Sequence, residues 1–243
     1  TPAPPSPRQT SAPADPAKTR LNRAGELRSS GCRENGAPLT TRTNVETYYR
    51  AVLRCLDRDW RPVLRKAGIA FAAPKLVVYN GRNARSTCNQ PGQISFYCPD
   101  SFTIYMYADE IIRPWKQYPG DDFSHLITRM AATHTIAHEY GHHVQQLSGI
   151  FEAYTGRWRT SRNRTALEIR SELQASCLAN QFIRAERRSY PVPDVMLRDW
   201  RWPLIYVANH GTVASQKDWI TRGRTHPRPR ACNTWVAPKK AVR

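Results

Sequence analysis

The sequence predicts an α+β fold that is mostly helical, with a small sheet preceding a long histidine-rich helix. Helical periodicity covers one segment before residue 70 and returns after residue 121, whereas short β-branched and aromatic stretches bounded by Pro and Gly lie between them. At 243 residues the chain is long enough for one domain with an ordinary hydrophobic core.

Residues 1–30 are predicted to form a flexible leader rich in Pro and Ala. They contain almost no large apolar side chain, so they cannot bury enough surface to offset the entropy cost of ordering. We therefore expect a single domain over residues 31–243.

The first expected helix covers residues 43–68, where apolar side chains recur at three- and four-residue steps and Asn44 is a candidate cap. Residues 73–81 follow as a strand between Pro74 and Gly81. Residues 87–110 indicate further strands around a Pro-Gly turn.

Helical periodicity then predicts a helix over residues 124–147, with Ser124 as its N-cap and Gly149 as its C-cap. A second helix is expected at about 165–187. The end of the chain indicates one short helix and then an irregular basic tail tied down by Cys232.

Six cysteines, an even number with no CxxC spacing, favour disulfides and an oxidising compartment. Six cysteines allow fifteen pairings. Cys88–Cys98 is favoured because the two flank a turn signal, and Cys32–Cys55 and Cys177–Cys232 follow by elimination. The sequence has neither a signal-peptide pattern nor an apolar run of about 20 residues, so we expect a processed, secreted chain with no membrane span.

The net charge of +18 attracts polyanions, so anionic surface polymers are candidate partners. Nucleic acid is disfavoured, because the chain lacks the stacking aromatics interleaved with basic residues of known nucleic-acid modules.

Three histidines, His134, His138 and His142, form one stripe on the expected helix 124–147. They cannot all bind one ion, since His134 and His142 lie about 12 Å apart along the axis. The pair His138 and His142 has Glu139 beside its first member, which is the HExxH pattern of two zinc ligands and a general base. Gly141 lowers helix stability, which indicates close approach of another backbone.

A catalytic zinc needs a third protein ligand and an open position for water. Glu168 and Glu172 lie four residues apart on one face of the next helix, and either could supply that ligand. His143 points away from His142 and is expected in packing or in support of the site. Tyr140 is expected in the core.

The segments AHEYGHHVQQLSG, ELQASCLANQF, HGTVASQKDWITRG and FYCPDSFTIYM resemble the neutral zinc metallopeptidase family, whose members read approximately AHExGHHVQ, ELQADC and HGxxxQRxxWFxxG. The resemblance implies a zincin-like α+β fold, Zn²⁺ and peptide-bond hydrolysis. It makes His138, His142 and Glu172 the metal ligands and Glu139 the base. His210 matches the family's HG segment and is a candidate for stabilising the transition state.

Two further features follow from the resemblance. Ser176 stands where the family has Asp, a residue placed to accept a hydrogen bond from a ligand histidine, so metal affinity is expected to be reduced unless another carboxylate substitutes. The strand SFTIYMY precedes the metal helix, as the substrate-binding edge strand does in zincins.

The sequence therefore predicts a secreted, monomeric zinc metallopeptidase that hydrolyses protein or peptide substrates with a zinc-activated water and Glu139 as general base. The alternative is a non-catalytic secreted protein that binds zinc or anions on the same scaffold. Ser176 and the large positive charge favour that alternative.

Overall fold

A computed structural model of the chain describes residues 15–81, 84–88, 90, 92–190, 207 and 209–243. Most of the regular structure is helical, and a small sheet precedes the histidine-rich helix, as the α+β prediction requires. The helices are α1 (Arg42–Lys66), α2 (Asp109–Gln117), α3 (Asp122–Leu147), α4 (Ile150–Thr160), α5 (Arg164–Ala185) and α7 (Val213–Thr225). Short 3₁₀ turns are η1 (Arg20–Arg23), η3 (Pro229–Cys232), η4 (Thr234–Val236) and η5 (Lys239–Ala241).

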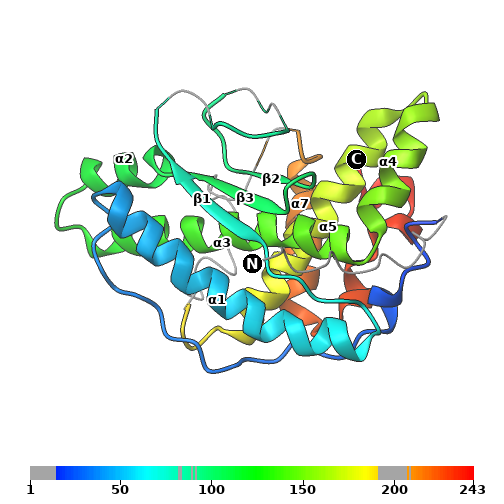
Figure 1. The fold of residues 1–243 in the computed structure, drawn as a ribbon, viewed down its shortest axis with the longest axis horizontal. Helices are drawn as coiled ribbons and strands as arrows, with labels where there is room; N and C mark the ends of the chain where they lie inside the picture. The colour runs from blue at the N-terminus through cyan, green and yellow to red at the C-terminus, as the bar shows by residue number, and fades with distance from the viewer. Residues whose placement is uncertain (1–14, 82–83, 89, 91, 191–206, 208) are drawn as a thin grey trace, which may run out of the picture.

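The sheet has the order β1-β3-β2 in the described part of the chain, formed by Lys75–Tyr79, Thr103–Tyr107 and Phe96–Cys98 respectively. β1 pairs with β3 in parallel, and β2 pairs with β3 antiparallel. Figure 1 shows the sheet on one side of the long α3 helix. α5 and α7 pack against each other.

The expectation that the strand SFTIYMY is an edge strand is wrong. β3 is central, because β1 from earlier in the chain pairs with one side of it and β2 with the other. All five β3 residues are buried. Of the two outer strands, β2 makes a side-chain contact with α3, since the Tyr97 hydroxyl lies 3.0 Å from His143 Nδ1.

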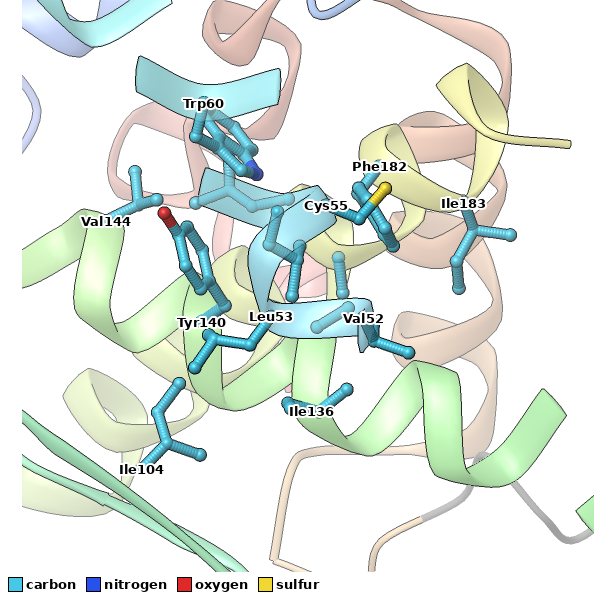
Figure 2. Close-up of a cluster of buried hydrophobic side chains, with 14 of the residues drawn as sticks. Val52, Leu53, Cys55, Trp60, Ile104, Ile136, Tyr140, Val144, Phe182 and Ile183 are labelled. Atoms are coloured by element: carbon cyan, nitrogen blue, oxygen red, sulfur yellow. The ribbon is translucent and has the colours of Figure 1, made fainter. Parts of the chain in front are cut away.

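The hydrophobic core lies where α1, α3 and α5 meet, beneath the sheet. Figure 2 shows part of it, with side chains from α1, α3, α5 and β3 packed together. The labelled side chains are Val52, Leu53, Cys55 and Trp60 from α1, Ile104 from β3, Ile136, Tyr140 and Val144 from α3, and Phe182 and Ile183 from α5. The histidine-bearing helix is therefore held on several sides by apolar packing.

Helices α1 and α3 are capped a few residues earlier than expected. Thr41, rather than Asn44, caps α1 by accepting the Asn44 N–H, and Asp121, rather than Ser124, caps α3 by accepting the N–H groups of residues 123 and 124. At the other end of α3, Gly149 has the left-handed φ of 74° that a terminating glycine supplies.

Two helices were absent from the sequence-based expectation. α2 covers only nine residues and carries Pro114, a residue that usually ends a helix, and α4 is an eleven-residue segment with only two buried residues. The strand pair β2 and β3 turns at residues 99–102 instead of at the Pro-Gly step, of which Pro91 lies outside the described residues.

All three expected disulfides, Cys32–Cys55, Cys88–Cys98 and Cys177–Cys232, are present. The first joins the segment before α1 to α1 itself. The last joins α5 to the C-terminal segment, which η3, η4 and η5 keep close to the helices.

Ordered structure begins earlier than the expected boundary at residue 30. Leu21 and Leu27 are each 1% exposed within the core, and the Ser30 N–H donates to both Asp59 and Glu186. Two leucines and backbone hydrogen bonds thus hold a stretch whose composition alone predicts a leader. Residues 1–14 of the predicted leader lie outside the described residues.

No helix within the described ranges is both long enough and apolar enough to cross a membrane.

Candidate metal centre

The site forms where α3 and α5 cross at close range. Gly141 permits that approach: a Cβ added there would lie 2.7 Å from the Ala175 carbonyl oxygen and 2.8 Å from the Ala175 Cα. The expectation that Gly141 marks close approach of another backbone is confirmed. The crossing brings the histidine face of one helix onto the carboxylate of the other.

Three side chains converge at this crossing. His138 Nε2, His142 Nε2 and Glu172 Oε2 form a triangle in which every side measures 3.1 Å. His138 and Glu172 come from different helices and are 34 residues apart in sequence. Atoms bound to one tetrahedral zinc at about 2.0–2.1 Å lie about 3.3 Å from each other, so the donor set has the spacing that a single ion requires.

The charges in this triangle are complementary. Burial acts to raise the pKa of Glu172, but the charge of His142 and hydrogen bonds from both histidines hold that pKa well below its ordinary range. Burial acts to lower the pKa of His142, and the Glu172 carboxylate outweighs it and raises the pKa to about 9. Glu172 is thus an anion in a protein interior, which a cation would stabilise.

The second ring nitrogen of each histidine has a partner beyond the triangle. His138 Nδ1 lies 3.0 Å from the Ser176 hydroxyl, at the position where the resembling family carries Asp. His142 Nδ1 lies 2.9 Å from Gln145 Oε1, one turn further along α3. Both rings are therefore oriented with Nε2 toward Glu172.

Glu139 follows His138 on α3 and is 7% exposed. Burial raises its pKa above the ordinary value, while His138 and His142 act to lower it, as does a hydrogen bond from the Tyr97 backbone on β2. A carboxylate with a raised pKa beside two histidines has the properties of a general base or acid.

His210 reaches the triangle from the segment before α7. Its Nε2 lies 3.3 Å from Glu172 Oε2, and its ring stacks on His138 with centroids 5.1 Å apart. Gly211 has a φ of 93°, and a Cβ there would lie 3.1 Å from the Arg243 carbonyl oxygen. The turn that presents His210 therefore requires glycine at residue 211.

Glu168, the other candidate third ligand, is held away from the triangle. Its carboxylate accepts a 2.8 Å hydrogen bond from the Trp158 indole. Arg170, two residues further along α5, donates to the carbonyls of Thr234 and Ala237.

Three other residues of the histidine stretch support the fold and lie outside the donor triangle. His134 is buried, and burial lowers its pKa to about 3. His143 bridges Tyr97 and the Ala72 carbonyl, 2.7 Å away, and so joins α3 to the segment before β1 and to β2. Tyr140 is in the core, as expected, and donates to Asp57.

A second group of potential ligands contains Cys32, Cys55, Asp59 and Glu186. Its cysteines form a disulfide, so they offer no thiolate, and its two carboxylates accept backbone N–H groups of residues 30 and 32. This group serves to fasten the segment before α1.

Sequence reasoning did not single out Gln145, Gln174 or Trp235, all of which contact the site or its supports. The glutamines lie within the motif segments, three residues after His142 and two after Glu172. That spacing was the available signal. Trp235 carried none, because its contact spans 61 residues.

Comparison with known proteins places these residues in a family context. A family model described as "Putative neutral zinc metallopeptidase" matches residues 20–191. The uncharacterized protein YpfJ of Escherichia coli K12 is 28% identical over 208 residues, covering 76% of this chain and 69% of that protein. The uncharacterized protein Mb2605 of Mycobacterium bovis is 24% identical over 211 residues, covering 75% and 68%. No solved structure matches the chain.

Proposed function

The chain belongs to the neutral zinc metallopeptidase family, and on that premise we propose that it is a zinc-dependent peptidase whose metal is held by His138, His142 and Glu172. The observation that carries the proposal is the triangle of donor atoms 3.1 Å apart. Two imidazoles and one carboxylate are a common catalytic zinc set, and such a site keeps one position open.

Zinc bound there would act as a Lewis acid that polarises the substrate carbonyl and makes water acidic enough to be deprotonated near neutral pH. Glu139 is proposed to accept the proton from the attacking water and then deliver it to the leaving amine. Burial raises its pKa above the ordinary value, which makes the Glu139 carboxylate a stronger base than an exposed one.

His210 is proposed to stabilise the negative charge that develops on the carbonyl oxygen. It approaches from outside α3 and α5, and burial lowers its pKa to about 4, so it would act as a neutral N–H donor. Its present contact with Glu172 shows how close to the donor triangle the ring can lie.

An extended peptide is proposed to lie along β2 instead of β3. β2 pairs with β3 on one side only in the described chain, and its residue Tyr97 contributes backbone hydrogen bonding to Glu139. A substrate strand added at this edge would bring its scissile bond past the general base.

The protein is proposed to work as a secreted monomer. Three disulfides are typical of chains that fold in an oxidising compartment, and they support export. The donor set comes entirely from one chain, so catalysis would need no second copy.

A second candidate function, binding of anionic polymers, is favoured by a separate pocket of about 300 Å³. Four arginines line it with a single carboxylate, Glu26. The arginines are Arg28, Arg184, Arg187 and Arg188. Replacing residues 184, 187 and 188 by Ala should weaken binding to a sulfated polysaccharide more than the same charge change at Arg54, Arg65 and Lys66 on α1.

Metal analysis and peptide digestion test the main proposal together. The purified protein should contain one zinc per chain and cleave members of an unbiased peptide library, and a chelator should abolish cleavage until zinc is restored. One zinc per chain without cleavage would support the non-catalytic alternative instead. Absence of tightly bound zinc would refute the metal centre.

A further inference from the structure

The C-terminal segment reaches the supports of the metal centre through Trp235. Cys232 ties this segment to α5, and Thr234 accepts from Arg170 and donates back to the Arg170 carbonyl at 2.7 Å. These contacts seat η4 on α5, close to the α3 crossing. The family match ends at residue 191, so Trp235 lies outside the matched region.

From Trp235 a chain of buried and half-buried hydrogen bonds leads to His142. The Trp235 indole donates to Gln174 Oε1 at 2.9 Å, and Gln145 Nε2 donates to the same oxygen at 3.0 Å. Gln145 Nε2 also donates to the Ser171 carbonyl at 2.9 Å. Gln145 Oε1 then lies 2.9 Å from His142 Nδ1.

The Trp235 indole and the Ser171 carbonyl together fix which atom donates in each bond of this chain. An indole N–H can only donate, so Gln174 must present its oxygen to Trp235. That oxygen and the Ser171 carbonyl can only accept, so Gln145 must present its amide nitrogen to both. Turning the Gln145 amide over would place its oxygen against two acceptors.

Gln145 therefore presents its oxygen to His142, and the Ser171 hydroxyl donates to that same oxygen at 3.2 Å. An oxygen facing His142 Nδ1 can only accept, so Nδ1 must carry a proton. A ring that holds a proton on Nδ1 offers its lone pair at Nε2, the atom that faces His138 and Glu172.

We propose that Trp235, acting through Gln174 and Gln145, is a positioning residue that keeps the proton of His142 on Nδ1 and leaves Nε2 to bind the metal. The purpose assigned to this arrangement rests on the proposed zinc site. The polarity that puts a proton on Nδ1 does not, but Nε2 also faces an acceptor, the Glu172 carboxylate, so a bound ion is what leaves Nδ1 as the one protonated nitrogen.

His138 lacks an equivalent constraint. Its Nδ1 faces the Ser176 hydroxyl, which can donate or accept, so this partner does not select one tautomer. The two histidines of the triangle are thus supported unequally, and His142 is the one whose Nδ1 proton is fixed by its hydrogen-bond partner.

Four variants separate polarity from packing. Trp235→Phe removes the indole donor and keeps an aromatic ring. Gln174→Met removes the acceptor, whereas Gln174→Glu keeps an acceptor for both Trp235 and Gln145. Trp158→Phe is the matched control. The Trp158 indole also donates to a side chain of α5, Glu168, but this bond lies outside the network.

Two measurements on the zinc-loaded protein report the effect: zinc affinity by chelator competition, and solvent exchange of the His142 Nδ1 proton by ¹⁵N-resolved NMR. Loss of a partner that orients a ligand weakens metal binding about 10- to 100-fold. We expect that range for Gln174→Met, about 10-fold for Trp235→Phe, faster proton exchange in both, and native behaviour in Gln174→Glu and Trp158→Phe.

Native affinity and native exchange in both Trp235→Phe and Gln174→Met would overturn the inference, as would an equal loss in Gln174→Glu. If the native chain binds no zinc, the proposed function fails, and exchange of the His142 Nδ1 proton is compared in the metal-free proteins. Exchange should still be faster in Trp235→Phe and Gln174→Met than in the native protein and Trp158→Phe, because the bonds that fix Gln145 are lost. Equal exchange in all four metal-free proteins would overturn the inference independently.

Discussion

Gly141 and Ala175 are in direct backbone contact across the crossing of α3 and α5, with room for a hydrogen but not for a methyl group. The distance between the two helices at this point sets the distance between His142 and Glu172, which lie one residue after the glycine and three before the alanine. The donor triangle therefore depends on a residue that contributes no donor.

Gly141→Ala should destabilise the protein by about 1–3 kcal/mol, the usual cost of overpacking, despite the better helix propensity of Ala. Zinc should be lost at the same time, because the helices must separate. Gly156→Ala in α4 is the control: a Cβ there meets nothing within 4 Å, and stability should rise by about 0.5–1 kcal/mol. Urea denaturation and zinc content of both variants decide it, and an unchanged Gly141→Ala protein would contradict the close-contact argument.

Glu139→Gln should retain fold and zinc while peptide hydrolysis falls by several orders of magnitude, at least the ~10²–10⁴-fold typical of a lost general base. The substitution removes only the proton acceptor and leaves the donor triangle intact. Single-turnover digestion with parallel metal analysis measures both quantities. Substantial hydrolysis by the variant would refute the proposed role of Glu139.

Glu172→Ala should lose most bound zinc and all activity, because it removes one side of the donor triangle. Glu168→Ala should keep zinc and activity, since it removes only the hydrogen bond from Trp158, worth about 0.5–1.5 kcal/mol of stability. Zinc is measured in both variants after identical dialysis. Full occupancy in Glu172→Ala would mean that the third ligand lies elsewhere.

Ser176→Asp should tighten zinc binding by about 10-fold or more, because a carboxylate accepts from His138 Nδ1 and makes the ring a stronger donor. Without metal the same variant should be less stable, since Ser176 is 5% exposed and the new charge would be buried. Ser176→Asn is the neutral control. Chelator competition and thermal unfolding with and without zinc measure the two opposite effects, and unchanged affinity in the Asp variant would be contrary to expectation.

Stability should decrease as pH rises between about 4 and 7, through Asp59. Burial raises the pKa of Asp59 to about 7, with Glu186 adding to the shift and the Ser30 hydrogen bond opposing it. A carboxyl whose folded pKa is raised binds a proton more tightly in the folded state, so its contribution is full below the unfolded pKa and is lost as pH passes the folded one. The urea midpoint should fall more between pH 5 and pH 8 for the native protein than for Asp59→Asn. Equal falls in the two proteins would exclude Asp59 as the source of the pH dependence.

Periodicity in the sequence was sufficient to place α1 and α7, because each buries side chains at three- and four-residue steps. α3 and α5 were placed by their apolar residues and their length, and α5 is buried continuously over residues 173–183. α2 and α4 were missed because they are short and bury two residues each. The central position of β3 could not be read from its own residues. It depends on parallel pairing with β1, which lies 28 residues earlier in the register.

For the site, the distance of about 12 Å between His134 and His142 along the helix excluded binding of one ion by all three stripe histidines. The family resemblance favoured Glu172 over Glu168. The indole that engages Glu168 could not be foreseen, because Trp158 lies on a helix that the pattern did not reveal. Nor could Leu21 and Leu27 be assigned to the core, since two isolated leucines in a Pro- and Ala-rich stretch give no period.

The contacts of the donor triangle join residues that are closer in sequence than the residues joined by the Trp235 hydrogen bond. His138 and His142 on α3 lie 30–34 residues from Glu172 on α5, with α4 between the two helices, and a contact over so short a stretch of chain costs less loop-closure entropy than a longer one. The Trp235 bond to Gln174 spans 61 residues, and the nearby disulfide spans 55. During synthesis from the N-terminus, the three donors therefore emerge and can meet before the tryptophan that orients one of them has left the ribosome.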